Sequence, residues 1–258
     1  MRKFNVLPVL LLTLPLMLAG CLDSDDEDDN PNDDSIWSLV PDSGGLDRSF
    51  TRFEDGSNLT EVVSGALSPE CVAIDTNGDT ANDGSKLEAF TFAASASGGG
   101  TGAYTVSVFL ADTECSVFTA DYADVVEFNY EAWSSSFDFN RIDITATAVG
   151  RLVNTDAAVT ALNDVTACTK TDWVISQSLA STADCSSADA DLNKLTGFQF
   201  NDSEMPVTVG SVLQGIFIVS GSLLSIAIDE EGARPSGTVD TSNNDYWVIN
   251  GADIYYQY

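Results

Sequence analysis

Alternation of apolar and polar residues dominates much of the chain after residue 85. In the segment 126–131, valine, phenylalanine and tyrosine at even positions alternate with acidic and amide residues at odd positions. This pattern is typical of a strand with one buried and one solvated face. The segments 104–110 and 142–149 follow the same rule. Further strands are expected around 90–92, 198–200, 215–220 and 224–228.

Turn residues separate these expected strands. Asn250-Gly251 lies between the apolar segments Tyr246–Ile249 and Ile254–Tyr258, which predicts a hairpin. The run Gly98–Gly102 is expected to form a looser turn. It leads into a strand and not into a helix, so it lacks the helix N-terminus that a phosphate-binding loop needs.

One short helix is expected among these strands. Asp156 precedes a segment with apolar residues at helical spacing that continues to Leu162, and an aspartate is a good N-terminal cap. Many strands at short spacing with turn residues between them indicate an antiparallel fold. The prediction is an all-β fold, a barrel or a sandwich, with one short helix.

The N-terminal region has a different pattern. A short basic start is followed by an apolar run over residues 4–18 and then by Leu18-Ala19-Gly20-Cys21. This is the layout of a signal peptide that ends in the lipobox of bacterial lipoproteins. Residues 1–20 would be removed, and Cys21 would carry acyl chains that hold the protein on a membrane. An uncleaved spanning helix is the weaker interpretation, because the run is short and holds two prolines.

An acidic segment follows this cysteine. Asp23–Asp34 has eight acidic residues and no basic one, a composition that stays solvated. Residues 21–35 are therefore expected to be the lipidated cysteine and a tether, and residues 36–258 a single β domain. A cation-collecting role of the tether is the alternative. Leu22 replaces the aspartate of the inner-membrane retention signal, which favours the bacterial outer membrane.

The charge of the chain restricts its partners. The formal net charge is −30, from 40 acidic and 10 basic residues. Such a chain repels nucleic acid phosphates, so no nucleic acid partner is expected. The expected partners are the membrane, through acylated Cys21, and either a small apolar ligand or a macromolecule of the cell envelope.

Four further cysteines fit export to an oxidising compartment. Cys71, Cys115, Cys168 and Cys185 allow three connectivities, of which the short loops 71–115 and 168–185 are favoured. A zinc site is the alternative. It is disfavoured because the chain has no histidine and no closely spaced cysteine pair.

The missing residue types also argue against an enzyme. Without histidine, neither a serine nor a cysteine nucleophile has its usual base. A hydrolase that uses a pair of carboxylates stays open as an alternative, because the chain offers many acidic residues.

One acidic loop suggests calcium. Asp75, Asn77, Asp79 and Asp83 place oxygen ligands at spacings that resemble the start of an EF-hand loop. The glycine and glutamate expected later in such a loop are replaced by Thr80 and Lys86. An ordinary turn is therefore the competing interpretation.

Three short motifs resemble uncharacterised exported bacterial lipoproteins. These are Cys168–Trp173 with Cys185 following, Arg141–Thr145, and the Arg-Pro segment Gly232–Pro235. The chain departs from that pattern before Cys71, where Ser64–Leu67 replaces Gly-Thr-Trp. The resemblance implies a lipocalin-like antiparallel barrel and an envelope location, but no activity.

Two functions are compatible with this interpretation. An eight-stranded barrel can hold one small apolar ligand, and Val126, Phe128, Tyr130 and Trp173 are its expected lining residues. The competing interpretation is that these side chains fill the core. The protein would then be a surface module for adhesion or envelope assembly, stabilised by calcium in the Asp75 loop.

Overall fold

The structure of the chain is a computed structural model, and every described residue belongs to the compact unit Asp34–Tyr258. It describes residues 38–39, 46–53, 71–76, 81–95, 98–134, 139–164, 172–176, 179, 197–200, 203–206, 208–228, 234–240, 248–249 and 252–257. The predicted lipidation site Cys21 and the acidic tether lie outside these residues. So do Cys168, Cys185, Asn77 and Asp79.

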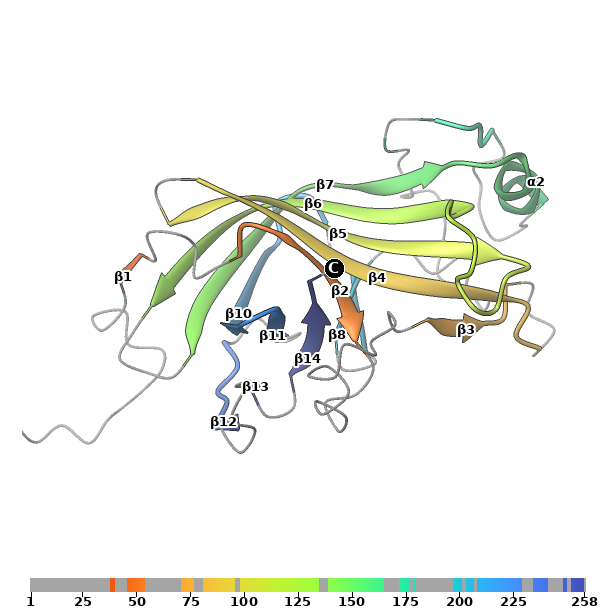
Figure 1. Cartoon of the computed structure of the whole chain (residues 1–258). Helices are drawn as coiled ribbons and strands as arrows, with labels where there is room; N and C mark the ends of the chain where they lie inside the picture. Colours follow the sequence, from red (N-terminus) through yellow and green to blue (C-terminus); the bar gives the residue numbers. More distant parts are fainter. Residues whose placement is uncertain are drawn as a thin grey trace, which may run out of the picture. The chain divides into compact units, whose positions relative to one another are not determined.

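Eight antiparallel strands form a closed barrel (Figure 1). Each strand pairs with the next one along the barrel, and the last strand returns to the first. The strands are β2 (Ser49–Phe53), β4 (Gly84–Ala94), β5 (Gly99–Leu110), β6 (Tyr122–Ser134), β7 (Asn140–Val153), β10 (Val212–Ser220), β11 (Leu223–Ile228) and β14 (Asp253–Tyr256). The predicted all-β fold is confirmed, and it is a barrel.

Two short strands pair with strands of the barrel, and four others form two separate pairs. β1 (Ser38–Leu39) pairs with β6, and β3 (Val72–Ile74) pairs with β4. Two further pairs are β8 (Gly197–Phe200) with β9 (Ser203–Pro206) and β12 (Val239–Asp240) with β13 (Val248–Ile249). The described part of the chain holds no helix long and apolar enough to span a bilayer.

The predicted short helix is confirmed as α2 (Asp156–Asp164), but its capping residue is Thr155. The Ala158 amide donates to Thr155 Oγ1 at 3.2 Å, which satisfies one of the free N–H groups of the first turn. Thr155 Oγ1 also donates to Asp121 Oδ1 at 2.5 Å. Asp156 instead places a negative charge in the first turn, where the helix dipole favours it. The buried face of α2 carries Ala158 and Leu162.

The predicted hairpin at Asn250-Gly251 is wrong. β13 pairs with β12, whereas β14 pairs with β11 on one side and β2 on the other. The physical reason is closure: β14 joins the two ends of the barrel sheet, so both of its edges are occupied by other strands. A turn signal between two apolar segments does not by itself establish that those segments pair.

The glycine run is also placed differently from the prediction. Gly98, with φ of 78°, belongs to the turn, but β5 already begins at Gly99. A Cβ atom on Gly102 would lie 2.5 Å from the ring of Phe128. The glycines from Gly99 onward are therefore strand residues. At Gly102 the residue is glycine because a larger side chain would collide with the ring of Phe128.

A small second core lies on the outer face of the barrel. Ile216 and Ile218 of β10 pack with Phe139 and with Ile249 of β13. Arg234 fixes the neighbouring segment, since its Nη1 donates to the carbonyl oxygens of Ile142 at 3.1 Å and Gly215 at 2.8 Å. Its Nη2 also pairs with Asp143. Arg234 thus attaches the segment that follows it to β7 and β10.

Candidate binding interior of the barrel

The interior of the barrel is lined by aromatic side chains from four strands. Phe90 lies at their centre, with ring centroids 5.4 Å from Phe92, 4.9 Å from Tyr104, 5.0 Å from Tyr255 and 6.3 Å from Phe128. Alternation along each strand directs these rings inward, where they are buried. The Phe90–Phe92 pair is stacked and the other three pairs are tilted or edge-to-face. Such aromatic pairs add about 0.5–1.5 kcal/mol each beyond the burial of their area.

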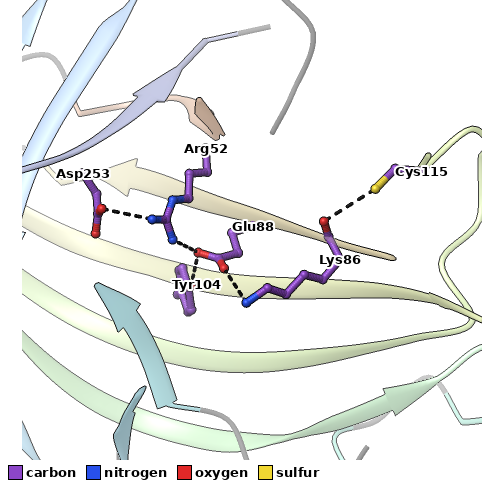
Figure 2. A network of polar contacts seen from close by, with 6 residues as sticks. All are labelled: Arg52, Lys86, Glu88, Tyr104, Cys115 and Asp253. Atoms are coloured by element: carbon purple, nitrogen blue, oxygen red, sulfur yellow. Dashed lines mark hydrogen bonds and ion pairs between the residues drawn. The ribbon is translucent and has the colours of Figure 1, made fainter. Parts of the chain in front are cut away.

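Charged side chains share the interior face with these rings. Glu88 on β4 is 2% exposed, and its Oε2 accepts from Arg52 Nη1 at 2.9 Å and from Tyr104 Oη at 2.8 Å. Lys86 Nζ lies 3.3 Å from Glu88 Oε1. Arg52 Nη2 also donates to Asp253 Oδ1 at 3.2 Å. We call Arg52, Lys86, Glu88, Tyr104 and Asp253 the interior polar cluster (Figure 2).

The electrostatics of this cluster keep its arginine charged. Burial alone would lower the pKa of Arg52, but the carboxylates of Glu88 and Asp253 more than offset it and raise that pKa above its ordinary value. The positive charges of Arg52 and Lys86 then face the negative charges of Glu88 and Asp253 inside the barrel, where the dielectric constant is low. Because a lone buried charge is costly, each member depends on the others for its compensation.

A second ion pair lies on the same interior face. Arg151 Nε donates to Asp124 Oδ1 at 2.6 Å, and its Nη2 donates to Asp124 Oδ2 at 2.8 Å. The guanidinium lies 4.3 Å from the ring centroid of Tyr122 and 5.8 Å from that of Trp173. Burial would lower the pKa of Arg151, but Asp124 raises it above its ordinary value. This two-point pairing fixes β6 against β7 from the inside.

The four predicted lining residues all lie in the main core. Val126, Phe128 and Tyr130 share the inward face of β6, and Trp173 packs beside Arg151. Asn163 holds the Trp173 backbone through two hydrogen bonds, at 2.8 Å and 3.1 Å. The structure thus brings the predicted residues to one interior. Their contact with a ligand stays a prediction.

Sequence reasoning missed both charged groups, although part of the signal was present. Lys86 and Glu88 have the same parity as Phe90 and Phe92, which places all four on one face of an alternating strand. A charged residue in register with core aromatics is a marker of an interior polar site.

One predicted disulfide lies among the described residues and is present. Cys71 and Cys115 are bonded, with a Cα–Cα distance of 5.8 Å. The Cys115 sulfur lies 3.5 Å from the Lys86 carbonyl oxygen, so this cysteine lies beside β4, the strand of Lys86 and Glu88 (Figure 2). The predicted 168–185 bond lies outside the described residues.

Removing the Cys71–Cys115 bond is expected to lower the free energy of unfolding by about 2–4 kcal/mol, since the bond closes a long loop of the unfolded chain. Denaturant unfolding of Cys71→Ser/Cys115→Ser measures the loss. A midpoint equal to that of the unsubstituted protein would contradict a stabilising role.

The loop between β5 and β6 is held by one carboxylate. Asp112 accepts from the amides of Glu114 at 3.0 Å, Ser116 at 2.7 Å and Val117 at 3.0 Å. The hydrogen bond from the Glu114 amide is the largest of the causes that hold the pKa of Asp112 below its usual range.

This depressed pKa predicts a pH-dependent stabilisation. The contribution of Asp112 is present above the ordinary aspartate pKa of about 4 and is lost as pH falls through the folded-state value. The gap in thermal midpoint between the unsubstituted protein and Asp112→Ala should therefore narrow from about pH 7 to about pH 3. Glu114→Ala on the same loop is the control. A gap that is constant with pH would contradict the assignment.

The predicted calcium loop is described only in part. Asp83 Oδ1 accepts from the amide and the hydroxyl of Thr76, both at 2.7 Å, which joins the residue before β4 to the chain that follows β3. Asp75 lies between the end of β3 and Thr76. Within the residues that the structure covers, no group of three or more acidic or cysteine side chains is arranged to hold a metal ion. The calcium site stays a prediction.

No family model, no curated protein and no solved structure matches the chain. The fold is therefore assigned from the pairing of the chain's own strands.

Proposed function

We propose that this protein is a lipid-anchored binding protein of the bacterial envelope whose barrel takes up a small, largely apolar ligand. The observation that carries the proposal is the composition of the interior: a cluster of aromatic rings with a few charged groups at fixed positions. Ligand sites have this character, since apolar walls supply affinity and a few polar groups fix orientation.

Stability alone gives little reason for these interior charges. Replacing buried ion pairs by packed apolar side chains is often neutral or stabilising. A barrel selected only for stability would favour an apolar residue at Glu88, which faces the same interior as Phe90. A role in orienting a polar group of the ligand accounts for Arg52, Lys86 and Glu88 together.

The interior is closely filled around the aromatic cluster, whereas the side chains of Arg52 and Lys86 are 14% and 20% exposed. Phe50, Phe90 and Val126 are 0% exposed, so no void of water size adjoins them. Binding then requires rings of the aromatic cluster to turn aside and make way for the ligand. The proposal therefore predicts a ligand of modest size and binding coupled to a rearrangement.

The test is a fluorescence titration with N-phenyl-1-naphthylamine, a neutral apolar probe, on residues 22–258. Saturable binding is expected, and Ala146→Leu should weaken it by about tenfold because it takes up interior volume. Ala148→Leu on the outward face of β7 is the matched control and should leave it unchanged. Absence of saturable binding, or equal effects of the two variants, would reject the interior site.

The anchor is tested separately. Cys21→Ser is expected to remove the acylation and to abolish incorporation of labelled palmitate into the chain, since the cysteine sulfur is the acceptor. Fractionation should place the unsubstituted protein with outer-membrane markers. Undiminished labelling of the variant would contradict the lipoprotein assignment.

A second candidate function, a surface interaction module, has one observation in its favour. The loop between β5 and β6 exposes Val117 to 50% and Phe118 to 109%, while Asp112 and the disulfide hold its backbone. A photo-crosslinking phenylalanine at position 118 should give one discrete adduct in cells if this module operates. A control at Thr101, also exposed, should give none. Absence of an adduct at position 118 would reject this candidate.

A further inference from the structure

Among the described residues, the two seams of β2 have the fewest residue pairs in the barrel, three each, and the seam between β11 and β14 follows with four. In the described part of the chain, β2 pairs with β4 through Ser49–Thr51 and with β14 through Thr51–Phe53. The Phe92 amide also donates to the Arg48 carbonyl oxygen, just before β2, at 2.9 Å. By contrast, β4 pairs with β5 from Gly84 to Ala94, and β5 pairs with β6 from Gly99 to Val108. Local opening follows the regions with the fewest backbone hydrogen bonds. By this measure β2, followed by β14, is the strand of the barrel with the fewest described pairs to its neighbours.

Two arginines hold this short strand from both ends. Arg52 inside the barrel joins β2 to Glu88 on β4 and to Asp253 on β14 (Figure 2). Arg48, just before β2, donates to Gln257 Oε1 at 2.8 Å and to the Gly221 carbonyl oxygen at 3.2 Å. Ionic contacts at this seam thus supplement the few backbone hydrogen bonds.

The seam also carries two of the interior rings. Phe50 of β2 packs 6.4 Å from Phe92, and Tyr255 of β14 packs 5.0 Å from Phe90, between ring centroids. When β2 moves away, Phe50 leaves the core with it, and the rings of Phe90 and Phe92 become accessible from the side. This movement supplies the volume that the filled interior lacks.

We propose that β2 is the gate of the barrel: ligand enters laterally between β2 and its neighbours, and Arg52 re-forms its contacts with Glu88 and Asp253 when the seam closes. The inference rests on the proposed binding function and adds the route by which the ligand reaches the interior. Lateral entry accounts for the position of the shortest described seams of the barrel, which lie beside its aromatic cluster.

A disulfide across the seam tests the gate. Thr51 and Ala89 are register partners that alternation places on the outer face, at a separation suited to a disulfide. Thr51→Cys/Ala89→Cys locks β2 to β4. Ala103→Cys/Glu127→Cys, another outward register pair, locks β5 to β6 and is the matched control. Non-reducing peptide mapping verifies each bond and the native Cys71–Cys115 bond.

The readout is the association rate of N-phenyl-1-naphthylamine in stopped flow. The seam lock should slow association by about tenfold or more relative to Thr51→Cys alone, and the control lock should not change it. An unchanged rate with the seam locked would overturn the gate while leaving the binding function intact. Failure of the unsubstituted protein to bind the probe would instead overturn the binding function on which the gate rests.

Hydrogen exchange gives an independent result that needs no ligand. The amides of β2 should exchange faster than those of β5 and β6 by about a hundredfold or more, because the seam opens without unfolding of the barrel. Arg52→Lys, which keeps the charge but loses the two-branched contact, should speed exchange of β2 further. Exchange of β2 as slow as that of β5 would overturn the gate whether or not the probe binds.

Discussion

Replacing Asp124 by alanine is expected to lower the free energy of unfolding by about 3–5 kcal/mol. Arg151 is 1% exposed and donates two hydrogen bonds to this carboxylate. Without Asp124, its positive charge would remain in the interior, beside the rings of Tyr122 and Trp173, and would lose the carboxylate that compensates it. Denaturant unfolding monitored by circular dichroism measures the loss.

The double variant Asp124→Ala/Arg151→Met separates the charge from the packing. It removes the buried cation while keeping an unbranched side chain of similar reach, so most of the lost stability should return. A double variant as unstable as Asp124→Ala would show that packing dominates the effect. A loss below about 1 kcal/mol in Asp124→Ala would contradict the buried ion pair itself.

Replacing Phe90 by alanine is expected to cost about 3–5 kcal/mol, because it leaves a cavity at the centre of the aromatic cluster. Four neighbouring rings face this position. Phe90→Leu, which keeps most of the volume, should cost less. Thermal and denaturant unfolding provide both values, and equal losses in the two variants would contradict a packed ring cluster.

The same variant has a consequence for binding. An apolar cavity lined by aromatic rings stays dry and accepts small apolar molecules. Phe90→Ala should therefore bind N-phenyl-1-naphthylamine more tightly than the unsubstituted protein, despite its lower stability. Weaker binding by a folded Phe90→Ala would argue that the interior is only a core.

Alternation made much of this barrel predictable from sequence. The strands that carry Phe90, Tyr104 and Val126 each keep one inward pattern, and the strand that carries Ile142 keeps it as far as Ala146. The closure of the barrel is harder to predict from sequence, because the closing strand β2 has only five residues and its inward positions include the charged Arg52. The hairpin prediction gives β14 the wrong partner, because the two strands that pair with β14 lie far from it in sequence.

A bulge explains why Arg151 was not recognised as an interior residue. Glu127 pairs with Ala148 and Phe128 with Ala146, so Thr147 is an extra residue in β7. Before the bulge, the even residues Ile142 and Ile144 face inward; after it, the odd ones do, including Arg151. A fixed period carried through the strand assigns Arg151 to the solvent side. Only the cross-strand register reveals the change of face.

Native mass spectrometry of residues 22–258, exported and purified gently, tests the proposed binding function most directly. We expect an excess mass that stays with the folded chain and leaves on unfolding as an extractable, largely apolar molecule. A bare mass that stays bare after incubation with an envelope lipid extract would contradict the binding function. So would an excess that a chelator removes completely, which would assign the bound species to a metal ion.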